Sequence, residues 1–169
     1  AALSFAYRNR DEGRLTSVLE SLFPIMIRLG RIEDGRRLYS EAVERMDDYV
    51  KLAENTQKVH VNMSRLNLLC KQGEIALQTG DLDQAEASFK MGLAGPPENM
   101  RELECRMRIG LAEVCLRRER FAEASTLLGE SLSLAATGKY DELEWQASLL
   151  QGRISVSYTH LTLPTKRIV

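Results

Sequence analysis

The sequence predicts an all-α protein built as an array of antiparallel helix pairs. Apolar residues recur at helical spacing over long runs, and one alternation of small and large side chains occurs three times. The three copies are LGRIEDGRRLYSEAV at 29–43, TGDLDQAEASFKMGL at 79–93 and RERFAEASTLLGESL at 118–132. Residues 1–155 show no pattern of paired strands that would compete with this fold class.

Each copy begins with a turn and continues as a helix whose one face carries small and bulky side chains in alternation. In the second copy these are Leu82, Ala85, Phe89 and Gly92, at offsets of three, four and three. The equivalent residues are Ile32, Gly35, Tyr39 and Ala42 in the first copy, and Phe121, Ala124, Leu128 and Ser131 in the third. Two helices approach closely only where small residues allow it. We therefore expect Ala85 and Ala124 to be buried where two helices cross, with Phe89 and Leu128 filling the space beside them.

A further amphipathic helix precedes each of these turns, so the repeating unit is a helix pair. The expected helices are 12–29, 32–54, 57–79, 82–94, 100–117, 121–137 and 140–155. Residues 1–155 then form one array: the tail of a unit, whole units near 12–54, 57–94 and 100–137, and a half unit at 140–155. Because the chain begins in mid-pattern, we expect it to be a fragment of a larger protein.

The unit at 66–99 resembles the tetratricopeptide repeat. The matching positions are the mid-helix Gly73, the turn at Gly80 and Asp81, Ala85 and Phe89 of the second helix, and the closing Pro97. The unit departs from the family in its first helix, where Leu69, Gln72 and Ala76 replace Trp, Leu and Tyr. The spacings of 50 and 39 residues between copies resemble the longer-period relatives in kinesin light chains and bacterial signalling regulators. The resemblance implies a right-handed α-solenoid, a TPR-like superhelix, that acts as a protein–protein interaction scaffold.

The segment 156–169 differs in composition from everything before it. It holds Ser157, Thr159, Thr162 and Thr165 with Pro164, which are all poor in a helix interior. The string VSYTHLTLPT also resembles the in-frame translation of an adapter used in transposon-based sequencing libraries. We therefore expect 156–169 to be a non-native tail and the last helix to end near 155.

Composition and motifs give no support for an enzyme. The net charge is −1, and no apolar run is long enough to span a bilayer, so neither nucleic acid nor a membrane is an expected partner. Cys70, Cys105 and Cys115 have neither zinc nor disulfide spacing and are expected as buried core residues of a cytoplasmic protein. We find no candidate catalytic, cofactor-binding or metal-ligating residues, and we expect no cofactor.

The expected binding surface is the concave groove that the first helices of the units line in such a solenoid. By resemblance to the family, the groove residues are Ser17, Glu20, Ser21, Arg28, Asn67, Lys71, Glu74, Gln78, Arg106, Glu113 and Arg117. Their charges are mixed, and Cys70 and Glu74 occupy positions of the family's clamp for a C-terminal carboxylate, which disfavours binding of chaperone tails. We expect charge reversal at Lys71 or Arg117 to weaken a bound peptide or helix. Reversal on the outer face, at Glu86 or Glu123, should do little.

Two alternatives remain at this point. The chain could be a regulatory or sensor segment of a larger signalling enzyme or transcriptional regulator, in intramolecular contact with domains outside the fragment. An RNA-binding helical repeat is less favoured, because it needs a basic groove and a strict period. The basic cluster of the sequence comprises Arg106, Arg108, Arg117, Arg118 and Arg120, and it is interpreted mainly as a solvated helix end.

Overall fold

The computed structural model describes the backbone of residues 12–52, 55–94 and 100–162, and all regular structure in these ranges is helical. The helices are α2 (Glu12–Arg28), α3 (Ile32–Leu52), α4 (Asn55–Thr79), α5 (Leu82–Leu93), α6 (Arg101–Arg117), α7 (Phe121–Gly138) and α8 (Asp141–Thr162). The predicted all-α class is confirmed, and from α2 to α7 every predicted boundary lies within two residues of the observed one. The predicted unit tail at 1–11 lies outside the described residues.

The last helix is longer than predicted. Helix α8 continues past Ser155 to Thr162, so the expected helix end near 155 is wrong. Ser and Thr cost only a few tenths of a kcal/mol in a helix interior, and a helix already formed propagates over such residues. The residue before a proline disfavours helical geometry, and α8 ends two residues before Pro164, which lies outside the described part. That 156–169 is a non-native addition stays a prediction.

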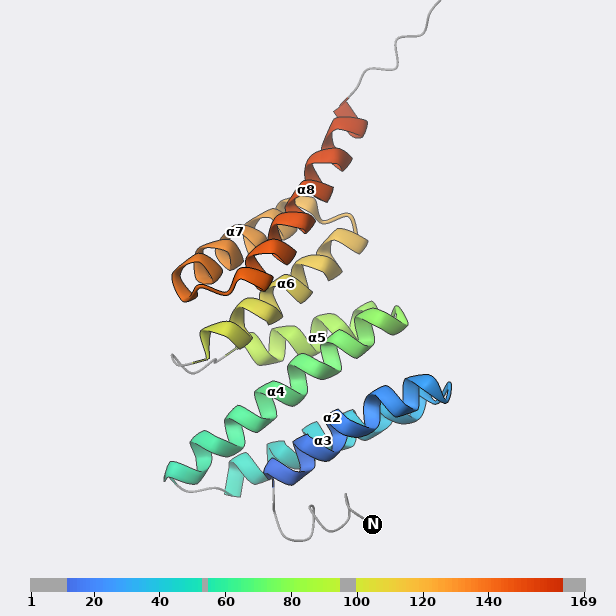
Figure 1. Cartoon of the computed structure of the whole chain (residues 1–169), viewed down its shortest axis with the longest axis vertical. Coiled ribbons are helices and arrows are strands. Elements are labelled where there is room, and N and C mark those ends of the chain that lie inside the picture. The colour runs from blue at the N-terminus through green and yellow to red at the C-terminus, as the bar shows by residue number, and fades with distance from the viewer. Residues whose placement is uncertain (1–11, 53–54, 95–99, 163–169) are drawn as a thin grey trace, which may run out of the picture.

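Successive helices pack as antiparallel pairs that stack along the long axis of the molecule (Figure 1). The first helices also contact one another, α2 with α4, α4 with α6, and α6 with α8. Among the described residues, the second helices α3, α5 and α7 make no such contacts with each other. The first helices are therefore closer together than the second helices. A stack with this geometry curves toward its first helices, which form the concave side.

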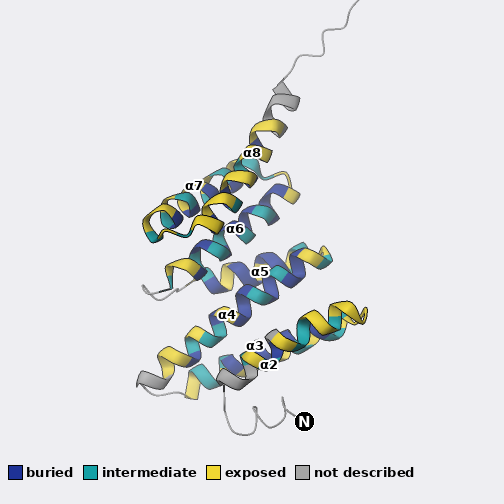
Figure 2. Ribbon diagram, in the orientation of Figure 1, coloured by how far each residue is buried: buried dark blue, intermediate teal, exposed yellow. Residues whose placement is uncertain are grey.

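The core follows the predicted alternation of small and large side chains. Ala85, Ala124, Phe89 and Leu128 are all fully buried, which confirms the register of the repeat. The ring of Phe89 lies between α4 and α6, and a Cβ on Gly73 would come within 2.5 Å of its Cε1 atom. Buried residues concentrate on α4, α5 and α6 at the centre of the stack (Figure 2).

Helix α6 is buried from two sides. Leu103, Met107 and Val114 belong to the core shared with α2 to α5, whereas Ile109 and Cys115 belong to the core shared with α7 and α8. Apart from Gly110, every residue of α6 that is not buried is charged. This central position allows α6 to hold functional side chains between two neighbouring first helices.

Candidate functional site

A stripe of polar side chains follows the concave side of α4. Asn67, Lys71, Glu74 and Gln78 recur at offsets of four, three and four, which places them on one side of the helix. Asn67 and Gln78 are exposed, and Lys71 and Glu74 are half-buried. Lys71 Nζ lies 2.7 Å from Glu74 Oε2. All four residues belong to the predicted groove, and the structure places them together.

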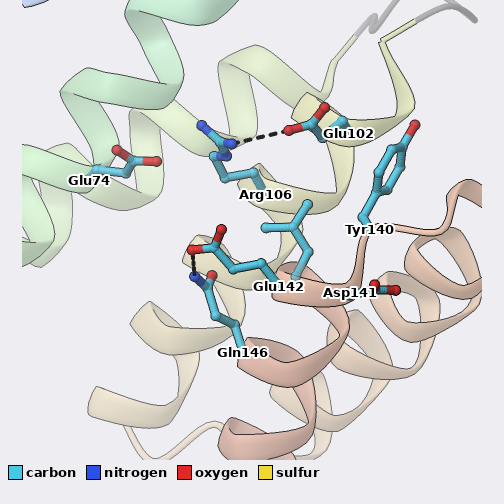
Figure 3. A pocket seen from close by; sticks show the side chains of 8 residues that line it. Glu74, Glu102, Arg106, Tyr140, Asp141, Glu142 and Gln146 are labelled. Carbon is cyan, nitrogen blue, oxygen red and sulfur yellow. Dashed lines mark hydrogen bonds and ion pairs between the residues drawn. The ribbon is translucent and has the colours of Figure 1, made fainter.

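The concave side is hollowed where α4, α6 and α8 meet. A cavity of about 400 Å³ is lined by Glu74, Glu102, Arg106, Tyr140, Asp141, Glu142, Leu143 and Gln146. In Figure 3, Arg106 lies between Glu74 of α4 and Glu102 of its own helix, with Glu142 and Gln146 of α8 below them. Arg106 Nη2 is 3.3 Å from Glu102 Oε1, and Gln146 Nε2 donates to Glu142 Oε1 at 3.3 Å. We call this cavity the acidic hollow.

Two further hollows adjoin the acidic hollow through shared residues. The first, of about 400 Å³, is lined by Phe23, Pro24, Ile27, Tyr39, Lys71, Glu74, Ile75 and Gln78, and we call it the apolar hollow. It shares Glu74 with the acidic hollow. The second, of about 250 Å³, is lined by Met63, Asn67, Met100, Glu102, Leu103 and Arg106. Together the three form a continuous surface across the first helices α2, α4, α6 and α8.

The charge of the acidic hollow is unbalanced. Four carboxylates face a single guanidinium group there, and Arg106 is already paired with Glu102. Within the described part of the chain, Asp141 and Glu142 have no cationic partner. Their carboxylates therefore remain available to a positively charged group from outside.

Cys70, which lies beside the groove residues, is a buried core residue and not a reactive thiol of the site. Cys70 is buried, and burial together with the nearby Glu74 carboxylate raises the pKa of its thiol to about 12. Burial likewise raises the pKa values of Cys105 and Cys115 to about 11. All three are free thiols in the core, as predicted, and the protonated form is unreactive at neutral pH.

The structure changes the membership of the predicted groove on α2. Ser17, Ser21 and Arg28 are exposed but line none of the three hollows, and the side chain of Glu20 lies outside the described residues. The α2 residues that do line the groove are Phe23, Pro24 and Ile27. Of these, only Ile27 belongs to the apolar run Ile25, Met26 and Ile27 that the sequence suggested as core filling; Ile25 and Ile27 are instead exposed.

The groove residues on α8 were missed. Glu142 and Gln146 follow Glu102 and Arg106 by 40 residues, the same interval that relates Gly152 to Ala112 in the sequence. Extending the groove positions by this interval would have identified both residues.

Arg117 has a structural role that the prediction did not include. Its Nη1 atom donates to the carbonyl oxygen of Leu77 at 2.7 Å, and its Nη2 atom donates to Glu113 Oε1 at 2.6 Å. Leu77 lies in the last turn of α4, where its carbonyl oxygen also accepts a longer hydrogen bond, of 3.3 Å, from the backbone N–H of Gly80. Arg117 therefore fastens the end of α6 to the end of α4. Neither it nor Glu113 lines a hollow.

The other arginines of the basic cluster are also occupied within the chain. Arg118 and Arg120 both pair with Glu86 Oε2, at 2.8 and 2.9 Å. Arg108 pairs with Glu104 at 2.7 Å and also contacts Glu130. These arginines therefore take part in ion pairs, and those of Arg118 and Arg120 hold successive units together.

The expectation that Glu86 lies on an open outer face is wrong. Its side chain is buried, with the residue 9% exposed, and it holds Lys90 in addition to Arg118 and Arg120. The sequence prediction failed because the two arginines come from the next repeat and close over the carboxylate. Glu123, the other residue expected there, is exposed and pairs with Arg120 at 3.1 Å.

The helix pairs with this geometry match a known family. The tetratricopeptide repeat family matches at residues 68–89, from the middle of α4 to Phe89, and at residues 106–130, which cover most of α6 and the first part of α7. The chain contains tetratricopeptide repeats. Curated proteins and solved structures gave no significant match. Tetratricopeptide repeats generally mediate protein–protein interaction. In this chain the acidic hollow lies on the side of the array that the first helices form.

Within the described ranges, no three His, Cys, Asp or Glu side chains converge in a way that could hold a metal ion. None of the described helices is long and apolar enough to cross a membrane.

Proposed function

We propose that this tetratricopeptide array is a binding scaffold whose concave face takes an extended segment of another protein. The observation that carries the proposal is the continuity of the three hollows, which share Glu74 on one side and Glu102 with Arg106 on the other. An extended segment that crosses four parallel first helices can place one side chain after another into such a row of hollows.

The chemistry of the hollows indicates a segment with a basic part and an apolar anchor. Asp141 and Glu142 offer carboxylates to Lys or Arg, and charge-assisted hydrogen bonds to carboxylates are stronger than neutral ones. Phe23, Pro24 and Ile27 offer an apolar surface at the other end of the groove. The amide groups of Asn67 and Gln78 can bond to the backbone of the segment, as polar groove residues do in other peptide sites.

The test is a binding measurement with labelled synthetic peptides of defined charge. One peptide combines Lys and Arg with a leucine anchor, a second replaces the basic residues by Glu, and a third replaces the leucine by Ser. We expect the first peptide to bind most tightly, and we expect its affinity to fall as salt is added, because exposed charge pairs are screened.

Variants of the chain locate the binding site. Glu74→Gln combined with Asp141→Asn should weaken the basic peptide by about tenfold, since each charged contact contributes on the order of 1 kcal/mol. Glu44→Gln is the matched control, because Glu44 is an exposed glutamate on the second helix α3. The proposal fails if the control variant weakens binding as much as the groove variant does. It also fails if the acidic peptide binds as well as the basic one.

A further inference from the structure

The last helix carries exposed apolar side chains on the side that faces away from the array. Trp145 and Leu149 are 65% and 53% exposed, and Val156 further along is 58% exposed. With Gly152 between them they recur at offsets of four, three and four, which places them on one side of α8. The opposite side is buried against α6 and α7 through Leu143, Ala147, Leu150 and Ile154. We call Trp145, Leu149 and Gly152 the end stripe.

In the unit formed by α4 and α5, the corresponding side of the first helix is covered. Gly73 of α4 is packed against the ring of Phe89, so close that a side chain at this position would overlap the ring. Gly152 belongs to the same column of small residues along the sequence, yet a Cβ placed on it would meet no atom within 4 Å. The end stripe therefore offers a gap that fits a ring, and it carries a large ring of its own at Trp145.

We propose that the end stripe binds the end stripe of a second copy of this chain, with the two α8 helices antiparallel. Trp145 and Gly152 lie at equal distances from the point between Ser148 and Leu149. A two-fold axis through that point sets the Trp145 ring of each copy over Gly152 of the other. A symmetric dimer interface has this property, because the same patch must complement itself.

The charges beside the end stripe support the same arrangement. Glu142 and Arg153 are both exposed, and at 3.6 residues per turn they lie on the same flank of the stripe, about 60° and 80° around the helix from Trp145. When a two-fold axis relates two antiparallel helices, the same flank of each helix faces that of the other. The midpoint between Glu142 and Arg153 lies one residue, or about 1.5 Å along the helix, from the midpoint between Trp145 and Gly152. Each Glu142 therefore lies beside Arg153 of the second copy, and the dimer contains two such pairs.

The association can be measured on the chain itself by sedimentation equilibrium and by tryptophan fluorescence. Trp145 is the one tryptophan of the sequence, so the emission reports on the interface directly. We expect a monomer–dimer equilibrium in the micromolar range, since one helix pair buries less area than a standard interface. The emission should shift to shorter wavelength as the dimer forms, because the ring leaves water.

Substitutions at exposed positions test the interface without disturbing the core. Leu149→Glu should raise the dimer Kd by about tenfold or more, because it buries a carboxylate at the centre of the contact. Met91→Glu is the matched control, since Met91 is an apolar side chain on α5 that is 46% exposed and outside the end stripe. A chain that stays monomeric up to about millimolar concentration, or a dimer that Leu149→Glu leaves intact, overturns the proposal.

A charge exchange distinguishes this interface from other modes of association. Glu142→Lys alone and Arg153→Glu alone should each weaken the dimer, because each places like charges side by side. The double variant restores opposite charges across the two-fold axis and should recover most of the affinity. A double variant as weak as the single ones would exclude the antiparallel pairing of α8.

Discussion

Phe89 of α5 packs against Gly73 of α4 so closely that no side chain fits at the glycine. The same ring also fills the space beside Gly110 of α6, so it joins two successive tetratricopeptide units. A single aromatic residue thereby sets both the spacing within one helix pair and the spacing to the next. The position of α6 between α4 and α8, and with it the shape of the acidic hollow, depends on this contact.

Gly73→Ala should destabilise the chain by about 1–3 kcal/mol, because the added methyl group overpacks against Phe89. Urea denaturation followed by circular dichroism measures the change. The control is Gly129→Ala in α7, where a Cβ would meet no atom within 4 Å. That variant should be more stable by up to about 1 kcal/mol, since Ala is the better helix former. Equal effects of the two substitutions would contradict the packing described for Phe89.

Ala85→Leu and Ala124→Leu should each lower the free energy of unfolding by about 1–3 kcal/mol, because both alanines are fully buried at helix crossings. Ala87→Leu is the matched control, since Ala87 is exposed on the same helix as Ala85. Thermal unfolding of the three variants provides the comparison. An unchanged midpoint for the two core variants would show that the register of the repeat is wrong.

The Glu86 carboxylate should make the stability of the array depend on pH. Hydrogen bonds from Lys90, and then from Arg120, hold its pKa below the usual glutamate value. A carboxylate with a lowered pKa in the folded state contributes stability above its unfolded pKa of about 4.3, and the contribution is lost as the pH falls further. Glu86→Gln should therefore be less stable than the parent chain near neutral pH.

The difference in the free energy of unfolding between the parent chain and Glu86→Gln should shrink as the pH falls from about 5 to about 3, because Glu86 becomes protonated. The other carboxylates titrate in both chains, so their contributions cancel in the difference. Guanidinium titrations at several pH values measure it. A difference that stays constant over this range would mean that Glu86 contributes by its shape and not by its charge.

Arg117→Met should destabilise the chain by about 1–2 kcal/mol, because it removes the charge-assisted, shorter one of the two hydrogen bonds that the Leu77 carbonyl accepts, while keeping the apolar stem of the side chain. Arg31→Met is a suitable control, since Arg31 is an exposed arginine that pairs with its neighbour Asp34 on the same helix end. Chemical denaturation gives both values. If both variants lose the same stability, the bond between α6 and α4 is not an important one.

The helices and the packing register could be predicted from sequence because both depend on local spacing. Offsets of three and four residues place Ala85 and Phe89 on one face wherever the helix lies in the fold. The hydrogen bonds of the buried Gln72 could not be predicted from local spacing. Gln72 replaces an apolar residue of the family, and its amide is satisfied by Ser40 at 2.9 Å and by Ser88 at 2.9 Å. Its partners are 32 and 16 residues away, so no local pattern could identify them.

The site was predicted less completely than the fold for a similar reason. The stripe from Asn67 to Gln78 was predicted by resemblance to the family, and helical periodicity places its residues on one side of α4. The pairing of Arg118 and Arg120 with Glu86 depends on how two successive units meet, and it turned an expected surface charge into a buried one. Whether a charged side chain faces a partner or another part of its own chain is decided by tertiary contacts.

The central claim is that the concave face of the tetratricopeptide array binds a protein segment. Amide chemical-shift mapping tests it most directly: the isotope-labelled chain is titrated with the Lys- and Arg-containing peptide that carries a leucine anchor. The account predicts that the largest shifts fall on Glu74, Arg106 and Glu142, with smaller ones along the remaining groove residues of α2, α4, α6 and α8. Shifts confined to α3, α5 and α7 would place binding on the convex side and would contradict it.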